Sequence, residues 1–267
     1  MSVQEQVQAI VDDALGTFGI YARNLGTSET VDVNADRVMN TESAAKVFIL
    51  LYYRQLVASG ACNPAQRVAL TDDDRYWGTG VLRYLGAGIQ PTLDDLAWLM
   101  IIVSDNVATA MLLQQIGDQN TVNAAMKELG LESAQLNPSI TVENAMAGEA
   151  FATATPRDLA EAFTFLDEPA KAILFRQQNQ ISLPRRLPHA ADASDVDIEM
   201  PLRVYNKPGN GMGTCTDSGL FETPNASWIV AAMAADQTDL ASRPDDAAPL
   251  AFSRIGELLF DAWGRSP

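Results

Sequence analysis

The spacing of apolar and polar residues predicts an alternation of helical and strand segments along the chain. Residues 4–16 carry apolar side chains at helical intervals, which predicts an amphipathic helix. Residues 18–25 and 30–34 alternate in the manner of two strands joined by a glycine-containing turn. From there to about residue 180 the pattern is helical with loops, and its strongest apolar segment lies at 93–116, interrupted at 104–106. We therefore expect a helix and a hairpin followed by a long helical region.

Strand character returns in the last third of the chain. Three short β-like runs are separated by glycine and proline turns, at residues 203–207, 218–221 and 226–232. A final helix is expected at 249–263. This order predicts a single α+β domain, with an antiparallel five-stranded sheet flanked by helices and an inserted all-helical lobe. Residues 1–42 and about 185–267 would form the α/β lobe, and about 43–184 the helical lobe.

Composition and charge narrow the partners that this chain can have. The chain has 267 residues, of which 47% are hydrophobic, and a net charge of −16. This charge argues against nucleic acid and against an anionic membrane as partner. The sequence shows no apolar stretch of membrane-spanning length and no signal peptide, so we expect a cytoplasmic protein. Cys62 and Cys215 are expected to be free thiols rather than a disulfide.

The strongest candidate for chemistry is Ser43-x-x-Lys46, followed directly by the apolar run at 47–53. We expect Thr41 to cap the helix and the two side chains to share one helix face. A serine hydroxyl needs a base, and a lysine can serve if burial or a neighbouring cation keeps it neutral. An isolated match of this kind is weak, because it also describes a surface serine and lysine on an ordinary helix.

Two further motifs follow in order, Ser104-Asp105-Asn106 and Lys207-Pro208-Gly209. The chain has only four lysines, and two of them fall inside the three motifs. Together the motifs resemble those of class A β-lactamases and penicillin-binding proteins, a superfamily of serine hydrolases. Similar segments extend the resemblance from about residue 15 to the C-terminus. It implies a β-lactamase/transpeptidase-like fold and a small-molecule substrate with an acyl group, and no metal or cofactor.

The resemblance also assigns roles to the proton-handling residues. Ser43 is expected to attack a carbonyl and become acylated, with Lys46 as the base. Ser104 would relay a proton to the leaving group, and Asn106 would orient Lys46 and the substrate. Lys207 would supply fixed positive charge beside Lys46.

The remaining expected roles concern the backbone and the loop. Asp105 would hold its loop in place. The oxyanion hole would consist of the backbone N–H groups of Ser43 and of Asn210, which follows Gly209 on the strand.

Two departures from the family pattern affect the expected substrate. Pro208 stands where the resembled enzymes have a threonine or serine that binds the carboxylate of β-lactams. The candidates to compensate for it are Lys207 and nearby hydroxyls such as those of Thr214 and Thr216. Ser133 stands where class A β-lactamases carry the deacylating glutamate, four residues before a Leu-Asn pair. The neighbouring carboxylates that remain as candidates for this base are Glu132, Glu143 and Glu149.

Several functional classes stay open on the sequence. An amidase or esterase fits the two departures best, and a β-lactamase or a D-Ala-D-Ala peptidase remains an alternative. A non-catalytic penicillin-binding-like sensor is the alternative from outside the enzymes. The single histidine, His189, has no catalytic context, so neither a serine–histidine triad nor a zinc site is expected. Tyr76 and Trp77 precede a glycine turn and are candidates for a wall of the pocket.

Overall fold

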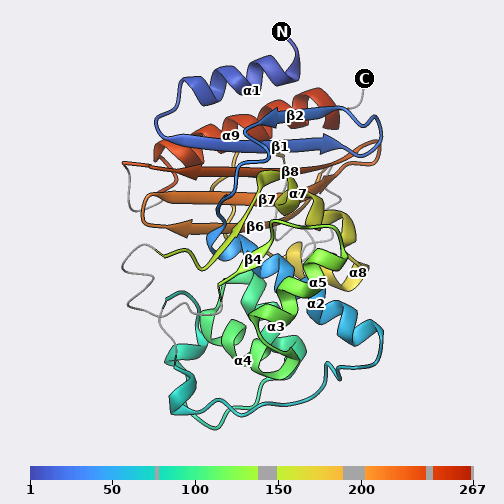
Figure 1. Cartoon of the computed structure of the whole chain (residues 1–267), viewed down its shortest axis with the longest axis vertical. Helices are drawn as coiled ribbons and strands as arrows, with labels where there is room; N and C mark the ends of the chain where they lie inside the picture. The colour runs from blue at the N-terminus through green and yellow to red at the C-terminus, as the bar shows by residue number, and fades with distance from the viewer. Residues whose placement is uncertain (76–77, 138–148, 189–201, 239–242, 266–267) are drawn as a thin grey trace.

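The fold is organised around a five-stranded antiparallel sheet with the order β2-β1-β8-β7-β6 (Figure 1). The computed structural model describes residues 1–75, 78–137, 149–188, 202–238 and 243–265. The strands are β1 (Thr17–Asn24), β2 (Thr30–Val33), β6 (Arg203–Gly211), β7 (Thr214–Glu222) and β8 (Ser227–Ala235). The first two strands and the last three thus meet in one sheet, because β1 pairs with β8.

Two helices from opposite ends of the chain cover one face of this sheet. These are α1 (Val3–Asp12) and α9 (Ala247–Leu259), which lie side by side (Figure 1). Ser2 and Glu5 form a reciprocal capping box at the start of α1, which fixes where the helix begins. Phe18 of β1 meets Phe252 of α9 edge to face, with ring centroids 6.1 Å apart. These contacts form a core separate from the one that joins the opposite sheet face to the other helices.

The helical part of the molecule lies beyond the edge strand β6 (Figure 1). Its helices are α2 (Lys46–Ala58), α3 (Leu93–Ile102), α4 (Asn106–Ile116), α5 (Gln119–Glu128) and α8 (Glu168–Leu174). A short further helix, α7 (Pro156–Glu161), contacts β1 and β8. The residues at the start of α2, from Lys46 to Leu51, are all buried, so this helix forms the centre of the lobe.

The predicted α+β fold is confirmed, and the differences from the predicted elements have physical causes. The strands β6, β7 and β8 each span nine residues, longer than predicted. Their interiors are buried on both faces, so polar and apolar residues do not alternate along them. The strongest apolar segment is interrupted as predicted, between the end of α3 and the start of α4.

A second, three-stranded sheet with the order β3-β5-β4 was not predicted. Its strands are β3 (Met39–Asn40), β5 (Ala152–Ala154) and β4 (Gln135–Leu136). Strands of two or three residues are too short to show a periodic pattern, so the sequence gives no sign of them.

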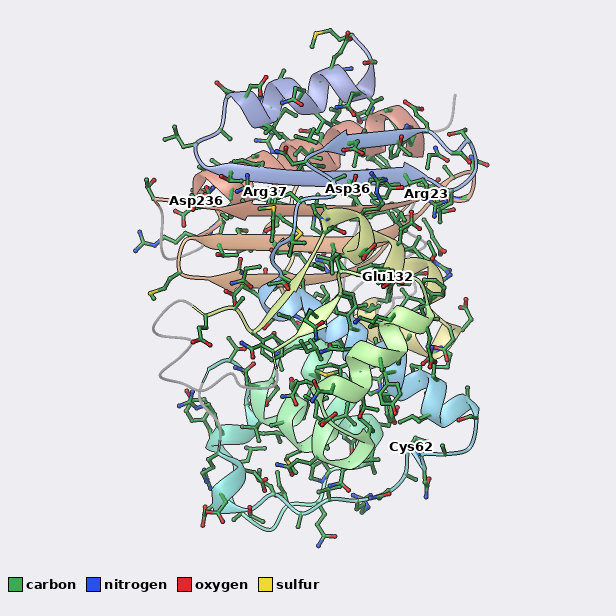
Figure 2. All side chains as sticks on the ribbon, viewed as in Figure 1. Arg23, Asp36, Arg37, Cys62, Glu132 and Asp236 are labelled. Carbon is green, nitrogen blue, oxygen red and sulfur yellow. The ribbon has the colours of Figure 1, made fainter. Side chains whose placement is uncertain are left out.

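The two cysteines are free thiols, as predicted. Cys215 is buried on β7, whereas Cys62 lies in the loop after α2, at the far end of the helical lobe (Figure 2). Across the described ranges, every helix is too short or too polar to span a bilayer.

Candidate active site

Ser43 lies in a single 3-10 turn, η1 (Glu42–Ala45), that runs directly into α2. Three residues per turn bring the side chains at positions 43 and 46 onto one line, as the motif spacing predicts. The predicted capping role of Thr41 is wrong: its backbone is helical (φ −89°, ψ −18°) and its side chain makes no capping hydrogen bond. The Thr41 hydroxyl instead donates to the carbonyl of Ala152 on β5, at 3.0 Å. The Thr41 hydroxyl is thus hydrogen-bonded to β5, which pairs with the segment before Thr41, and does not cap the helix.

Lys46 is 1% exposed and its amine is surrounded by oxygen atoms. Its Nζ donates to the carbonyl of Ser104 and to Oδ1 of Asn106, both at 2.7 Å, and lies 3.1 Å from Oγ of Ser104. Two N–H groups therefore meet oxygens that can only accept, while the third direction faces a hydroxyl that can also donate. A neutral amine is fully hydrogen-bonded in this arrangement.

The electrostatic surroundings also favour neutral Lys46. Burial lowers the pKa of Lys46 well below its ordinary value, and the positive charge of Lys207 lowers it further, against the attraction of Asp105. A lysine that acts as a base must be buried or lie near another cation, and both conditions hold here, because Lys46 and Lys207 meet at Ser104.

Ser104 links the two lysines. Its Oγ lies 3.1 Å from Nζ of Lys46 and accepts a hydrogen bond of 3.1 Å from Nζ of Lys207. Its backbone lies in the left-handed region, with φ of +56°, which costs roughly 1–3 kcal/mol for a residue with a side chain. Its carbonyl accepts from Lys46 and from the Thr79 hydroxyl at 2.7 Å. These bonds hold the strained residue with its hydroxyl between the amines.

Asp105 is fully buried and fixes the loop that carries Ser104. Its Oδ1 accepts from the backbone N–H of Ala108 at 3.0 Å, which caps α4. Its Oδ2 accepts from the N–H groups of Val81 and Leu82 at 2.6 and 2.9 Å. Gly80 has φ of +111°, and a Cβ there would lie 2.2 Å from Cγ of Asp105. The loop at 78–82 therefore folds tightly over this carboxylate.

Lys207 reaches the same place from β6. Its Nζ donates to the Ser104 Oγ and, at 2.8 Å, to the carbonyl of Pro208. Burial lowers the pKa of Lys207 to about 7 and raises the pKa of Asp217, which lies opposite Pro208 on β7, to about 7. Their mutual attraction opposes both shifts and favours the ionised pair. Lys207 therefore supplies positive charge next to Lys46 while it is protonated, and its pKa of about 7 places the loss of this charge near neutral pH.

Asp217 is a contributor to the site that the sequence analysis did not single out. Its carboxylate accepts from Nδ2 of Asn206 and from the backbone N–H of Leu183, both at 3.0 Å. The sequence signal for it was a buried-type strand that carries an acid between small and apolar residues, but its attraction to Lys207 depends on the pairing of β6 with β7. Thr216 next to it does not replace the missing hydroxyl at position 208, because its own hydroxyl is fully buried and donates to the carbonyl of Asn40.

Strand β6 contacts the Ser43 turn at Gly209. A Cβ on Gly209 would lie 2.8 Å from the backbone nitrogen of Ser43, 2.6 Å from that of Ala44 and 2.5 Å from the carbonyl oxygen of Thr41. Asn210 follows Gly209 and is exposed, whereas the strand residues from Val204 to Gly209 are buried. The structure thus brings the strand segment 209–210 against the backbone of the Ser43 turn, and these are the two segments from which the sequence analysis expected an oxyanion hole.

We expect Gly209→Ala to lower the rate of Ser43 acylation by roughly 100-fold, because a methyl group would push β6 away from the turn by a fraction of an ångström to an ångström. The measurement is the pre-steady-state acylation rate with an activated ester. Gly86→Ala is the matched control, since a Cβ there meets nothing within 4 Å. Equal rates for the two variants would show that this contact does not shape the site.

Ser133, at the position of the class A deacylating glutamate, has a structural role. Its N–H and its hydroxyl both donate to Oδ2 of Asp158 at 2.8 Å, and the hydroxyl lies 3.0 Å from that of Thr155. These bonds tie Ser133 to the first turn of α7. Glu132 (Figure 2) and Glu149 are exposed. Glu143, and the aromatic pair Tyr76 and Trp77, lie outside the described residues.

The geometry can be compared with known proteins. The family model described as "Beta-lactamase enzyme family" matches residues 2–263. The chain belongs to this family. The carbapenem-hydrolysing β-lactamase KPC of Klebsiella oxytoca is 26% identical over 169 residues, which are 60% of this chain and 55% of that protein. The chain therefore matches only about half the length of this curated relative.

Solved structures match over nearly the whole chain. A β-lactamase from Sphaerobacter thermophilus DSM 20745 is 27% identical with a TM-score of 0.83, covering 99% of this chain and 98% of that one. PBP-A has a TM-score of 0.81 at 24% identity, covering 97% of this chain and 95% of that one, which shows a shared fold. These matches confirm the superfamily and the fold that the motifs predicted. Within the part of the chain that the structure describes, no group of three or more histidine, cysteine or acidic residues forms a metal site.

Proposed function

We propose that this protein is a serine hydrolase that acts through an acyl-enzyme on Ser43. The observation that carries this proposal is the buried amine of Lys46, held by two carbonyl acceptors and next to a second lysine. Such an amine is neutral at a pH where an ordinary lysine is charged, so it can take the proton of a serine hydroxyl. Membership of an enzyme family supports the same conclusion.

The arrangement supports the following reaction. Lys46 accepts the proton of Ser43, and Ser43 Oγ forms a bond to the substrate carbonyl carbon. The negative charge on the carbonyl oxygen is stabilised by the N–H groups of Ser43 and Asn210. When the bond to the leaving nitrogen or oxygen breaks, Ser104 gives its proton to that atom and is reprotonated by Lys46. Lys207, hydrogen-bonded to the same hydroxyl, favours return of the proton from Lys46.

The substrate class is inferred from what surrounds the reacting atoms. A carboxylate beside the acyl group would find the amine of Lys207 already bonded to Ser104 and Pro208, and no hydroxyl at position 208. Ser133 does not supply a deacylating base. We therefore propose a small amide or ester as the preferred substrate, with β-lactams acylating Ser43 and leaving it slowly.

Stopped-flow kinetics test this proposal. With a p-nitrophenyl ester we expect turnover, and with a chromogenic cephalosporin a burst of about one product per enzyme, followed by a steady state roughly 100-fold slower, because general base assistance is missing. The Ser43→Ala variant should show neither phase. Release of product by wild-type protein at the same rate as by Ser43→Ala would contradict the proposal.

A D-Ala-D-Ala peptidase or penicillin-binding protein is the second candidate. The position of Ser133 favours it, because a stable penicillin adduct follows when no carboxylate activates water. An adduct with a penicillin that persists for hours, together with release of D-alanine from a peptide ending in D-Ala-D-Ala, would identify this class. Ester turnover without D-alanine release would identify the amidase or esterase.

A further inference from the structure

Glu42, the residue immediately before the nucleophile, has a carboxyl group that the reaction above does not use. Its backbone has φ of +47°, in the left-handed region that disfavours side chains. Nδ2 of Asn40 donates to its Oε1 at 2.8 Å, and the Glu42 N–H donates to Oδ1 of Asn40 at 2.9 Å. A Cβ on Gly211 would lie 2.2 Å from the same Oε1. The carboxyl group is therefore held between Asn40 and the end of β6.

This position places the carboxyl group next to both segments of the proposed oxyanion hole. Glu42 directly precedes Ser43 in the chain, and Gly211, next to which its carboxyl group lies, directly follows Asn210. The two expected N–H donors, of Ser43 and Asn210, are therefore sequence neighbours of Glu42 and Gly211. A negative charge at this place repels the negative charge that develops on the substrate oxygen, and a neutral carboxyl group does not. The charge on Glu42 therefore bears directly on the step that forms the oxyanion.

No cation in the described part of the chain is paired with Glu42. The elements packed against its turn carry these titratable groups: Lys46, Tyr52, Tyr53 and Arg54 on α2, Arg203, Tyr205 and Lys207 on β6, and Cys215, Asp217 and Glu222 on β7, while β5 contributes none. Arg54 pairs with Asp167. The two lysine amines bond to other atoms, at Ser104, Asn106 and Pro208. Burial raises the pKa of Glu42 above its ordinary value, and the hydrogen bond from Asn40 opposes this rise.

We propose that Glu42 controls the charge behind the oxyanion hole, so that acylation of Ser43 is fastest with the carboxyl group protonated and slows as it ionises. This inference rests on the proposed function of Ser43. It makes Glu42 a positioning and electrostatic residue, which does not touch the substrate, and it explains why a strained position next to the nucleophile holds an acid.

The test compares Glu42→Gln, which is neutral and has the same shape, with wild-type protein in pre-steady-state acylation by a p-nitrophenyl ester from pH 5 to pH 9. The titration of Lys46 affects both proteins and divides out of the ratio of their rates. We expect this ratio of variant to wild type to be lowest at the acid end and to rise towards the alkaline end, where it is expected to be roughly ten. Glu128→Gln, an exposed control on α5, should stay at one throughout.

The other outcomes are equally informative. A ratio that does not change with pH overturns the inference. Unchanged acylation combined with slower deacylation in Glu42→Gln also overturns it, and would identify Glu42 as the deacylating base. If Glu42→Gln fails to fold, Glu42→Met removes the same charge and must give the same rising ratio. Acylation of Ser43 with a flat ratio sinks this inference alone, whereas the absence of any adduct in wild-type protein sinks the proposed function as well.

Discussion

Replacing Lys46 with methionine is expected to lower the rate of Ser43 acylation by roughly 1,000-fold, within the range for loss of a general base. Methionine keeps most of the side-chain volume in this fully packed position but has no basic nitrogen. Lys46→Arg is expected to be just as slow, because a guanidinium group stays charged and cannot accept the proton of Ser43. The measurement is the pre-steady-state burst with an activated ester, alongside thermal unfolding to show that both variants fold.

The pH dependence of wild-type acylation follows from the same amine. Lys46 acts as a base only when deprotonated, so the rate rises as pH increases through its pKa. Because burial and Lys207 lower that pKa, the rise lies well below 10.5. At higher pH the rate falls once Lys207 loses its proton, since its positive charge is then lost from the site. A rise in rate only near the ordinary lysine pKa, or a Lys46→Met variant within tenfold of wild type, would contradict the role of Lys46.

Asp105→Ala is expected to lower the free energy of unfolding by roughly 3–5 kcal/mol, the range for leaving buried partners of a charged group unpaired. Three backbone N–H groups, of Val81, Leu82 and Ala108, lose their acceptor inside the protein, where water does not replace it. The loop that carries Ser104 loses its support at the same time, so we expect acylation to fall as well. Urea unfolding followed by circular dichroism measures the change in stability.

Asp118→Ala is the matched control for this prediction. Asp118 also caps a helix, α5, and accepts from the N–H of Thr121, but it is exposed, and water can take its place. Its loss should be clearly smaller than that of Asp105→Ala. Equal losses would show that the buried hydrogen bonds of Asp105 do not hold the loop.

The parts of the site that the sequence predicted are those that depend on local patterns. Ser43 and Lys46 lie on one turn, and Ser104 and Asp105 lie between the apolar helices α3 and α4. Sequence spacing alone therefore indicated the local position of these residues. The association of Lys46 with Lys207 depends on a strand far along the chain and was predicted only through the resemblance. Family motifs here carried information that periodicity does not contain.

The residues that sequence reasoning missed depend on contacts between distant segments. The Thr41 hydroxyl donates to β5 instead of capping a helix, because the two-residue strand β3 pairs with the three-residue strand β5 there. Asp217 matters through its attraction to Lys207 on the neighbouring strand β6, and Glu42 through its position next to Gly211. Neither acid has a spacing that distinguishes it from the many surface carboxylates of a chain with net charge −16.

The most direct test of the central claim is to locate the acyl group after brief reaction with an activated ester or a penicillin, quenching in acid and digestion with trypsin. Cleavage after Arg37 and Lys46 gives a peptide of residues 38–46 in which Ser43 is the only serine. The account predicts the added mass on this peptide, with fragmentation placing it on Ser43. The Lys46→Met variant lacks the cleavage site at position 46, so its Ser43 lies in a peptide of residues 38–54, which is expected to be unmodified at the same time point. An adduct on another residue, or an equally modified Ser43 without Lys46, would contradict it.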